Sequence, residues 1–150
     1  MRLREILRDE ILDAALSGYD RFICGAAMGT DILFGEQVLS VQAERHPDIR
    51  LICAIPHPNQ AKHWPERWQR RYQILLEASN ESRLIADLFT RGCYHRRNRW
   101  MVDQSDAVLA VWDGRPGGGT AYTVGYAMKM KKGIVRIDPE TLNRIVLPKP

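Results

Sequence analysis

The sequence predicts an α/β fold, a three-layer sandwich in which helices cover both faces of a mainly parallel sheet. Two observations support this prediction. Amphipathic helical patterns alternate along the chain with short, continuous apolar runs, which are typical of parallel strands buried on both faces. Two of these runs lead through a glycine-rich loop into a helix. With 150 residues, of which 45% are hydrophobic, the chain is expected to form a single domain over residues 1–150.

The chain opens on an amphipathic helix rather than on a strand. Apolar residues recur at helical spacing from Leu3 to Ala15, and Gly18 is a candidate C-cap. Pro47 is expected to end a second helix, and Pro65 to be the first residue of a third. After its opening helix, the first half is therefore predicted to contain a strand over 21–24, a helix over 31–46, a strand over 51–55 and a helix from residue 65.

The second half repeats the alternation with shorter elements. Gly133 is expected to separate its last helix from a final short strand. The tail after that strand ends in Leu147-Pro148-Lys149-Pro150 and is predicted to contain no further strand. The predicted elements are a weak strand over 83–86, a helix over 96–104, a strand over 107–112, a helix to about residue 132 and a strand over 134–137.

The most informative segment is the glycine loop Gly117-Gly118-Gly119-Thr120, which is entered through Asp113-Gly114-Arg115-Pro116. It lies between an apolar strand and a helix start. Consecutive glycines let the backbone approach a ligand, and the free N–H groups and dipole of a helix start favour phosphate or carboxylate. We therefore predict an anion cradle formed by Gly117, Gly118, Gly119 and Thr120. The alternative is a flexible connection without a ligand.

A second loop of the same kind, Gly25-Ala26-Ala27-Met28-Gly29-Thr30-Asp31, also follows a predicted strand. The carboxyl ends of parallel strands meet at one sheet edge, so the two loops are expected to share one site. The contacts expected from this loop come from Gly25, Met28, Gly29, Thr30 and Asp31. Neither G-x-G-x-x-G nor G-x-x-x-x-G-K-[ST] occurs, so neither a standard dinucleotide site nor a P-loop is indicated.

The composition limits the classes of protein that need consideration. No apolar run reaches the ~20 residues of a membrane span, and the N-terminus carries charges where a signal peptide is apolar. We therefore predict a cytoplasmic protein without a membrane partner. Cys24, Cys53 and Cys93 are odd in number and widely spaced, which argues against a disulfide framework and fits a reducing compartment.

Positive charge is concentrated in two places, although the formal net charge is only +4. Such clusters suit phosphate-bearing partners, and a solvated helix face is the alternative for each. In the second cluster, Arg96 and Asn98 are candidate contacts to phosphate or ribose. The clusters consist of Lys62, His63, Arg67, Arg70 and Arg71, and of Arg91, His95, Arg96, Arg97 and Arg99.

Several carboxylates and aromatic residues have two readings each. Asp31 is either a helix cap or a contact to a ligand hydroxyl, and Asp113 either starts the Asp-Gly turn or holds a ribose hydroxyl. Glu36 is expected to be solvated or ion-paired rather than a catalytic acid. Trp112 is expected in the core, although it and Tyr94 could stack on a base.

A zinc site is not predicted, and neither is any other metal. Cys53, His57, Cys93 and His95 lack the paired short spacings of structural zinc sites. Cys24 and Cys53 also fall inside apolar strands, where small buried side chains are common.

Four blocks of the sequence together resemble one family. They are residues 23–31, 54–60, 90–98 and a last block of Ser105-Asp106, Asp113-Gly114 and Gly117–Thr120. In this order they resemble the YpsA-like branch of the SLOG superfamily, which also contains DprA/Smf and the LOG phosphoribohydrolases. The resemblance covers nearly the whole chain. It implies a Rossmann-like domain that binds a nucleotide or a nucleotide-derived ligand such as an ADP-ribose or NAD-like molecule.

Two departures from the family pattern matter for function. The branch usually begins with a strand and a Thr-Gly-His-Arg-Pro-like loop, so either the start is truncated or the sheet lacks the family's first strand. A sheet edge left open in this way is expected to favour a homodimer. In LOG enzymes the motif P-G-G-x-G-T-x-x-E ends in a catalytic glutamate, whose place falls on Thr123 here, so phosphoribohydrolase activity is not expected.

These observations leave three hypotheses about function. The first is a sensor or regulator that binds a small nucleotide-type ligand, with no cofactor established. The second is a hydrolase or transferase acting on a nucleoside or ribosyl group, with Asp31, Glu36 or Asp113 as acid or base. The third is DprA-like binding of single-stranded DNA through the Arg91 to Arg99 cluster, which would depend steeply on salt.

Overall fold

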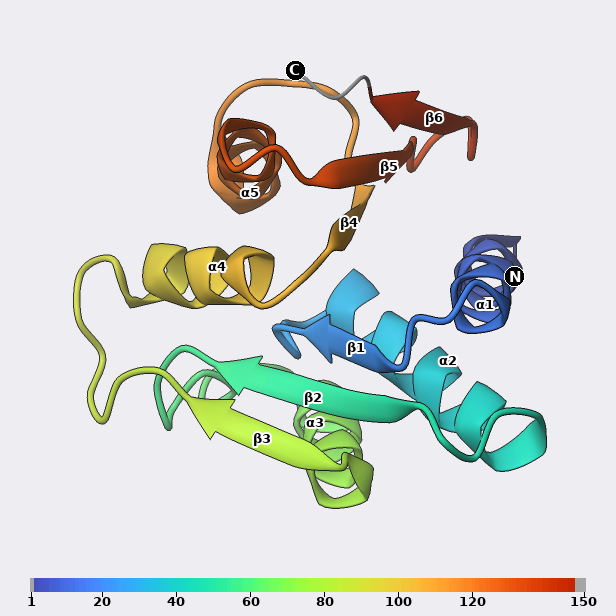
Figure 1. Ribbon diagram of the computed structural model, residues 1–150. Coiled ribbons are helices and arrows are strands. Elements are labelled where there is room, and N and C mark those ends of the chain that lie inside the picture. The colour runs from blue at the N-terminus through green and yellow to red at the C-terminus, as the bar shows by residue number, and fades with distance from the viewer. Residues whose placement is uncertain (1, 148–150) are drawn as a thin grey trace. The chain divides into compact units, whose positions relative to one another are not determined.

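The structure is a computed structural model that describes residues 2–147. Helices and strands alternate along the chain, and three of the four strand pairs are parallel, so the predicted α/β class with mainly parallel strands is confirmed. The chain divides into two compact units, Met1–Thr90 and Arg91–Pro150. Each unit has its own three-stranded sheet, rather than a share in the single sheet that the alternation predicts (Figure 1).

The first unit contains a parallel sheet in the order β1-β2-β3 and three helices. β2 lies in the middle and is buried from its second residue on, as expected of a strand whose residues are apolar without alternation. The elements of the first unit are α1 (Arg2–Leu16), β1 (Arg21–Cys24), α2 (Thr30–Glu44), β2 (Arg50–Ile55), α3 (Glu66–Ala78) and β3 (Glu81–Leu84).

Side chains from the helices and strands of this unit build one hydrophobic core. Ile11 of α1, Ile32 of α2 and Leu75 of α3 are at most 1% exposed in it. α1 lies against α2, where Arg8 donates from Nη1 to the Ser40 hydroxyl at 2.9 Å. The amphipathic opening helix is thus a structural part of the first unit.

The second unit combines parallel and antiparallel pairing. β4 and β5 are parallel, whereas β5 and β6 form an antiparallel pair. The hydrophobic core of this unit contains Val124 and Ala127 of α5 and Ile134 of β5. The elements of this unit are α4 (Cys93–Asp103), β4 (Ala107–Val111), α5 (Gly118–Lys129), β5 (Gly133–Ile137) and β6 (Arg144–Leu147).

The prediction that the tail contains no further strand is wrong, because β6 pairs with β5. The turn between them is fixed by Asp138, whose Oδ1 accepts hydrogen bonds from the N–H groups of Glu140 and Thr141, both at 2.9 Å. The run Ile145-Val146-Leu147 is the sequence signal for the strand. It is only three residues long, and a hairpin partner decides the structure of so short a run.

The other elements were placed by the sequence to within a few residues. Pro65 is the N-cap of α3 rather than its first residue, and α5 begins inside the glycine run, at Gly118. α4 begins at Cys93, three residues before the predicted start, since the left-handed Gly92 (φ 110°) precedes it directly. Residues 148–150 of the predicted tail lie outside the described residues.

Candidate functional site

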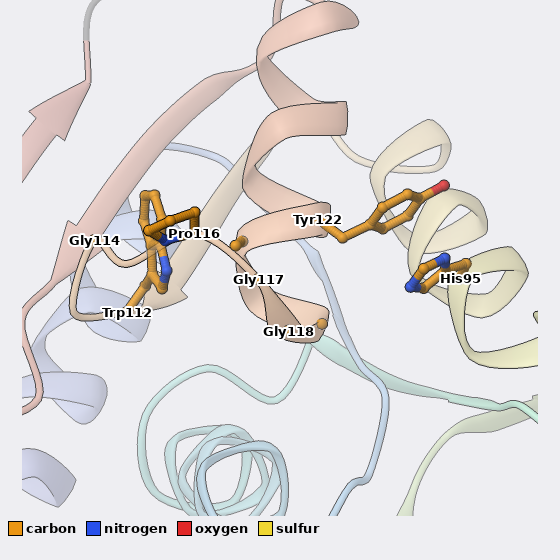
Figure 2. A pocket seen from close by; sticks show the side chains of 9 residues that line it. His95, Trp112, Gly114, Pro116, Gly117, Gly118 and Tyr122 are labelled. Atoms are coloured by element: carbon orange, nitrogen blue, oxygen red, sulfur yellow. The ribbon is translucent and has the colours of Figure 1, made fainter.

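A pocket of about 680 Å³ lies in the second unit, around the start of α5. Figure 2 shows Trp112 and Pro116 on one side of this helix start, and Tyr122 with His95 on the other. All of the described residues that line the pocket belong to this unit. They are His95, Trp112, Gly114, Pro116, Gly117, Gly118, Gly119, Ala121 and Tyr122.

The loop from β4 to α5 turns because three of its glycines adopt left-handed backbone angles. Gly114 and Gly117 both have φ of 88° and Gly118 has φ of 81°, where a side chain would strain the backbone. Asp113 starts the turn, since its Oδ1 accepts a hydrogen bond from the N–H of Arg115 at 2.9 Å. Of its two readings, the turn is therefore the one with a contact in the structure, and Asp113 is not among the pocket residues.

The glycines at the start of α5 leave the backbone accessible. Gly117 is the N-cap, and no side chain caps the first turn of the helix. A Cβ atom built on Gly117 or Gly118 would meet no atom within 4 Å apart from those of the adjoining residues and of the backbone of the helix itself. An approaching anion therefore meets backbone N–H groups and the positive end of the helix dipole without a side chain in the way. Thr120 lies in the same first turn and is exposed.

Two aromatic side chains in the pocket are held by protein groups. Trp112 donates from its indole N–H to the carbonyl of Arg115 at 3.0 Å, and the guanidinium of Arg136 lies 5.4 Å from the ring centroid. Tyr122 stacks on His95, with ring centroids 3.8 Å apart and an angle of 6° between the planes. Arg99 donates from Nη1 to the Tyr122 hydroxyl at 2.7 Å. The rings are therefore positioned before any ligand arrives.

His95 and Tyr122 were not predicted as pocket residues. His95 was considered as part of a basic cluster and as a zinc ligand, and Tyr122 was not considered. Tyr122 follows Gly118 by four residues, so on a helix it lies one turn above the glycine loop on the same face. That spacing could have identified it, whereas its stacking on His95 depends on how α4 packs against α5.

α4 directs the predicted Asn98 toward the glycine loop. The Nδ2 atom of Asn98 would lie 3.8 Å from a Cβ built on Gly119, and its Oδ1 accepts a hydrogen bond from Nε of Arg97 at 2.8 Å. Arg97 is only 4% exposed, whereas the predicted Arg96 is on the exposed side of the helix. Arg97, rather than the predicted Arg96, is therefore the arginine that donates a hydrogen bond to Asn98.

The first glycine loop lies in the other unit, and two of its backbone groups are paired within that unit. The carbonyl of Gly25 accepts a hydrogen bond from Nε2 of the buried Gln60 at 3.4 Å. Asp31 accepts one from the N–H of Ala27 at 3.3 Å, which is a bond within the loop. Gly29, the N-cap of α2 with φ of 99°, and Met28, which is 47% exposed, are the accessible members. Thr30 is the first residue of α2. A site shared by the two loops stays a prediction.

The remaining candidate acids also have protein partners. Glu36 is ion-paired with Arg71, with Oε1 and Nη2 2.5 Å apart, as expected for this helix residue. Thr123, at the place of the LOG glutamate, donates its hydroxyl to the carbonyl of Gly119 at 2.9 Å. No Asp or Glu occurs among the described residues that line the pocket. Within residues 2–147, no three His, Cys, Asp or Glu side chains come together as a metal site would require.

The basic residues of the two predicted clusters are partly used within the protein. Arg67 and Arg71 lie over the ring of Trp68, at 5.9 and 4.3 Å from its centroid. In the second cluster, Arg97 supports Asn98 and Arg99 binds Tyr122. Two arginines of that cluster therefore position pocket residues.

Comparison with known proteins agrees with the sequence blocks. The YpsA model, that of the YspA SLOG family, matches residues 2–142. The chain belongs to this family. It is 30% identical over 134 residues to an uncharacterized SPbeta prophage-derived protein, YoqJ, of Bacillus subtilis, covering 80% of this chain and 77% of YoqJ. It is also 24% identical over 140 residues to a UPF0398 protein of Bacillus licheniformis, covering 87% of this chain and 72% of that relative.

Membership of the SLOG family associates the chain with nucleotide-related binding in general. A UPF0398 protein of Bacillus cereus is similar as well, at 26% identity over 133 residues, covering 85% of this chain and 70% of the relative. Among the described helices of this family member, none is both long and apolar enough to cross a membrane.

Proposed function

We propose that this SLOG protein is a sensor or regulator that binds a nucleotide-derived ligand, of the ADP-ribose or NAD type, in the pocket of its second unit. The observation that carries the proposal is the combination of an uncapped, glycine-lined start of α5 with two held aromatic rings in one pocket. A phosphate fits the first feature and a base fits the second. Nucleotides are small molecules that carry both groups.

The size of the pocket supports a ligand of this kind. At about 680 Å³ it lies within the range of about 300–1,000 Å³ that is common for small-molecule sites. The pocket is adjacent to Asn98, whose amide faces the first turn of α5. An amide at this place can bind a ribose hydroxyl or a phosphate oxygen.

Binding without turnover is the form of the proposal that the side chains support best. General acid–base catalysis needs a titratable group within hydrogen-bond reach of the reacting atoms. The described lining has His95 but no carboxylate, and Asp31, Glu36 and Thr123 have the protein contacts described above. A nucleoside- or ribosyl-processing enzyme is the weaker candidate because none of the three carboxylates considered as its acid or base lines the pocket.

Two tyrosines of α5 provide a matched test. Tyr122 lines the pocket, whereas Tyr126, one turn later, does not. Each hydroxyl bonds to α4 at 2.7 Å, that of Tyr122 to Arg99 and that of Tyr126 to Asp103. We expect Tyr122→Ala and Tyr126→Ala to lower the melting temperature to a similar extent. Only Tyr122→Ala should weaken binding of ADP-ribose, by about 5-fold to 150-fold if the ring contributes about 1–3 kcal/mol of stacking.

The measurement is titration calorimetry with ADP-ribose, NAD and AMP, together with a thermal-shift assay of the three proteins. Equal loss of affinity in both tyrosine variants would contradict the proposed place of the ligand. Binding of an oligodeoxynucleotide with a steep salt dependence, and none of the small ligands, would favour nucleic acid instead. Release of adenine or nicotinamide, followed by chromatography, would favour an enzyme.

A further inference from the structure

Two of the three cysteines lie directly opposite each other in the sheet of the first unit. Cys24 ends β1, and the parallel register pairs it with Cys53 of β2. Their side chains belong to the same hydrophobic core, at 4% and 0% exposure, and they are hydrogen-bonded to each other. Paired strands lie about 4.8 Å apart, which is within the Cα separation of about 4.4–6.8 Å that a disulfide spans.

We propose that Cys24 and Cys53 are a redox-active pair that closes to an intramolecular disulfide on reaction with a peroxide and thereby changes the adjoining Gly25–Asp31 loop. The proposal does not depend on the ligand of the second unit. Cys93, which is also buried and free but lies on α4 of the other unit, provides an internal reference.

The surroundings of the pair give the two thiols different roles. The hydrogen bond from Cys24 lowers the pKa of the Cys53 thiol from its ordinary value, although burial opposes this shift. The same hydrogen bond, together with burial, raises the pKa of the Cys24 thiol. In the proposed reaction Cys53 is the attacking sulfur, because the thiolate is the form that attacks an oxidant.

The reaction balances with hydrogen peroxide as the oxidant. The Cys53 thiolate attacks one peroxide oxygen and breaks the O–O bond, which gives a sulfenic acid and a hydroxide that takes up a proton to become water. The sulfur of Cys24 then attacks the sulfur of Cys53, and its own proton leaves with the sulfenic oxygen as a second water. Two thiols lose two electrons and two protons, and one peroxide is reduced to two waters.

Formation of the disulfide is expected to affect the Gly25–Asp31 loop because Cys24 is bonded directly to Gly25. An S–S bond is about 2.05 Å long, so the two sulfurs must approach each other, which changes the side-chain torsions of Cys24 at the end of β1. Gly25 is held to Gln60, and Asp31, which binds the N–H of Ala27, is close enough to raise the pKa of both thiols. A shift of Cys24 is therefore expected to disturb the bond between Ala27 and Asp31.

The test treats the folded protein with hydrogen peroxide and then alkylates it in denaturant. We expect the reduced protein to take up three alkyl groups and the oxidised protein one, on Cys93, with a disulfide-linked peptide pair that contains Cys24 and Cys53. Dithiothreitol should restore three. Hydrogen exchange of the Ala27 amide should be at least threefold faster in the oxidised form.

Variants assign the order of the two sulfurs. Cys24→Ser should stop at a Cys53 sulfenic acid that dimedone traps, Cys53→Ser should form none, and Cys93→Ser should behave like wild type. Three alkylated cysteines after peroxide in the wild-type protein, or a disulfide that includes Cys93, would overturn the proposal without reference to any variant. A disulfide that leaves the exchange of Ala27 unchanged would overturn the link to the loop.

Discussion

The two strand–glycine–helix segments of this chain look alike in sequence and differ in structure. In the first, between β1 and α2, the loop binds itself and its own unit: Asp31 accepts from the N–H of Ala27, and Gln60 donates to the carbonyl of Gly25. In the second, between β4 and α5, Gly117 and Gly118 are exposed and line a pocket. Both helices begin at a glycine N-cap without a side-chain cap, and both loops have internal hydrogen bonds, so the difference is the pocket that the second loop lines.

The difference shows that a glycine motif after a strand does not by itself identify a ligand site. Glycines allow the left-handed backbone angles of a tight turn, and they are needed whether or not an anion binds there. The surroundings of the loop decide. The second loop lines a pocket together with aromatic side chains, and on that ground it is the better candidate for a nucleotide phosphate.

The largest expected effect tests whether α2 is packed more tightly than α5. A Cβ on Gly35 of α2 would lie 2.9 Å from Cδ1 of Leu75, whereas one on Gly125 of α5 would meet nothing within 4 Å. We expect Gly35→Ala to lower the free energy of unfolding by about 1–3 kcal/mol through overpacking. The same change at Gly125 should raise it by about 0.5–1 kcal/mol through helix propensity. Urea denaturation measures both, and an equal change in both variants would remove this contrast between the helices.

A smaller effect distinguishes the two readings of Asp31. If its role is the hydrogen bond to the N–H of Ala27, then Asp31→Ala should lower the free energy of unfolding by about 1 kcal/mol and leave the affinity for ADP-ribose unchanged. Asp9→Ala, at an exposed aspartate of α1, is the control for loss of charge. Loss of affinity at unchanged stability would instead support a contact between Asp31 and a ligand hydroxyl.

The smallest effect concerns pH and the β5–β6 hairpin of the second unit. The N–H groups of Thr141 and Glu140 hold the pKa of the Asp138 carboxyl below its ordinary value. Because the folded-state pKa is the lower one, the stabilisation is present above the ordinary Asp pKa of about 3.9 and is lost as the pH falls through the folded-state value. Asp138→Asn should therefore reduce the difference in unfolding free energy between pH 6 and pH 3. An unchanged difference in Asp138→Asn would contradict the role of this carboxylate.

The sequence determined most of the fold because the elements are specified locally. Continuous apolar runs of strand length define β1, β2, β4 and β5, and the helical spacing from Leu3 onward defines α1. β6 was missed because its run of three apolar residues is stable as a strand only beside β5. The division of the strands between two sheets was also not predicted, since strand pairing depends on contacts between residues far apart in the chain.

For the candidate site, the sequence by itself determined the glycine loop and the family. The motif Gly117-Gly118-Gly119-Thr120 and its place after an apolar strand identified the start of α5, and the blocks identified the YpsA branch of SLOG. Only the tertiary structure placed His95 against Tyr122 and Asn98 toward Gly119, because these neighbours come from α4 and α5, which the sequence separates by the whole of β4. Likewise, only the structure showed that the carbonyl of Gly25 is paired, since its donor, Gln60, lies 35 residues further along the chain. Glycine spacing is local, but whether the polar groups of a loop are paired depends on the packing of distant segments.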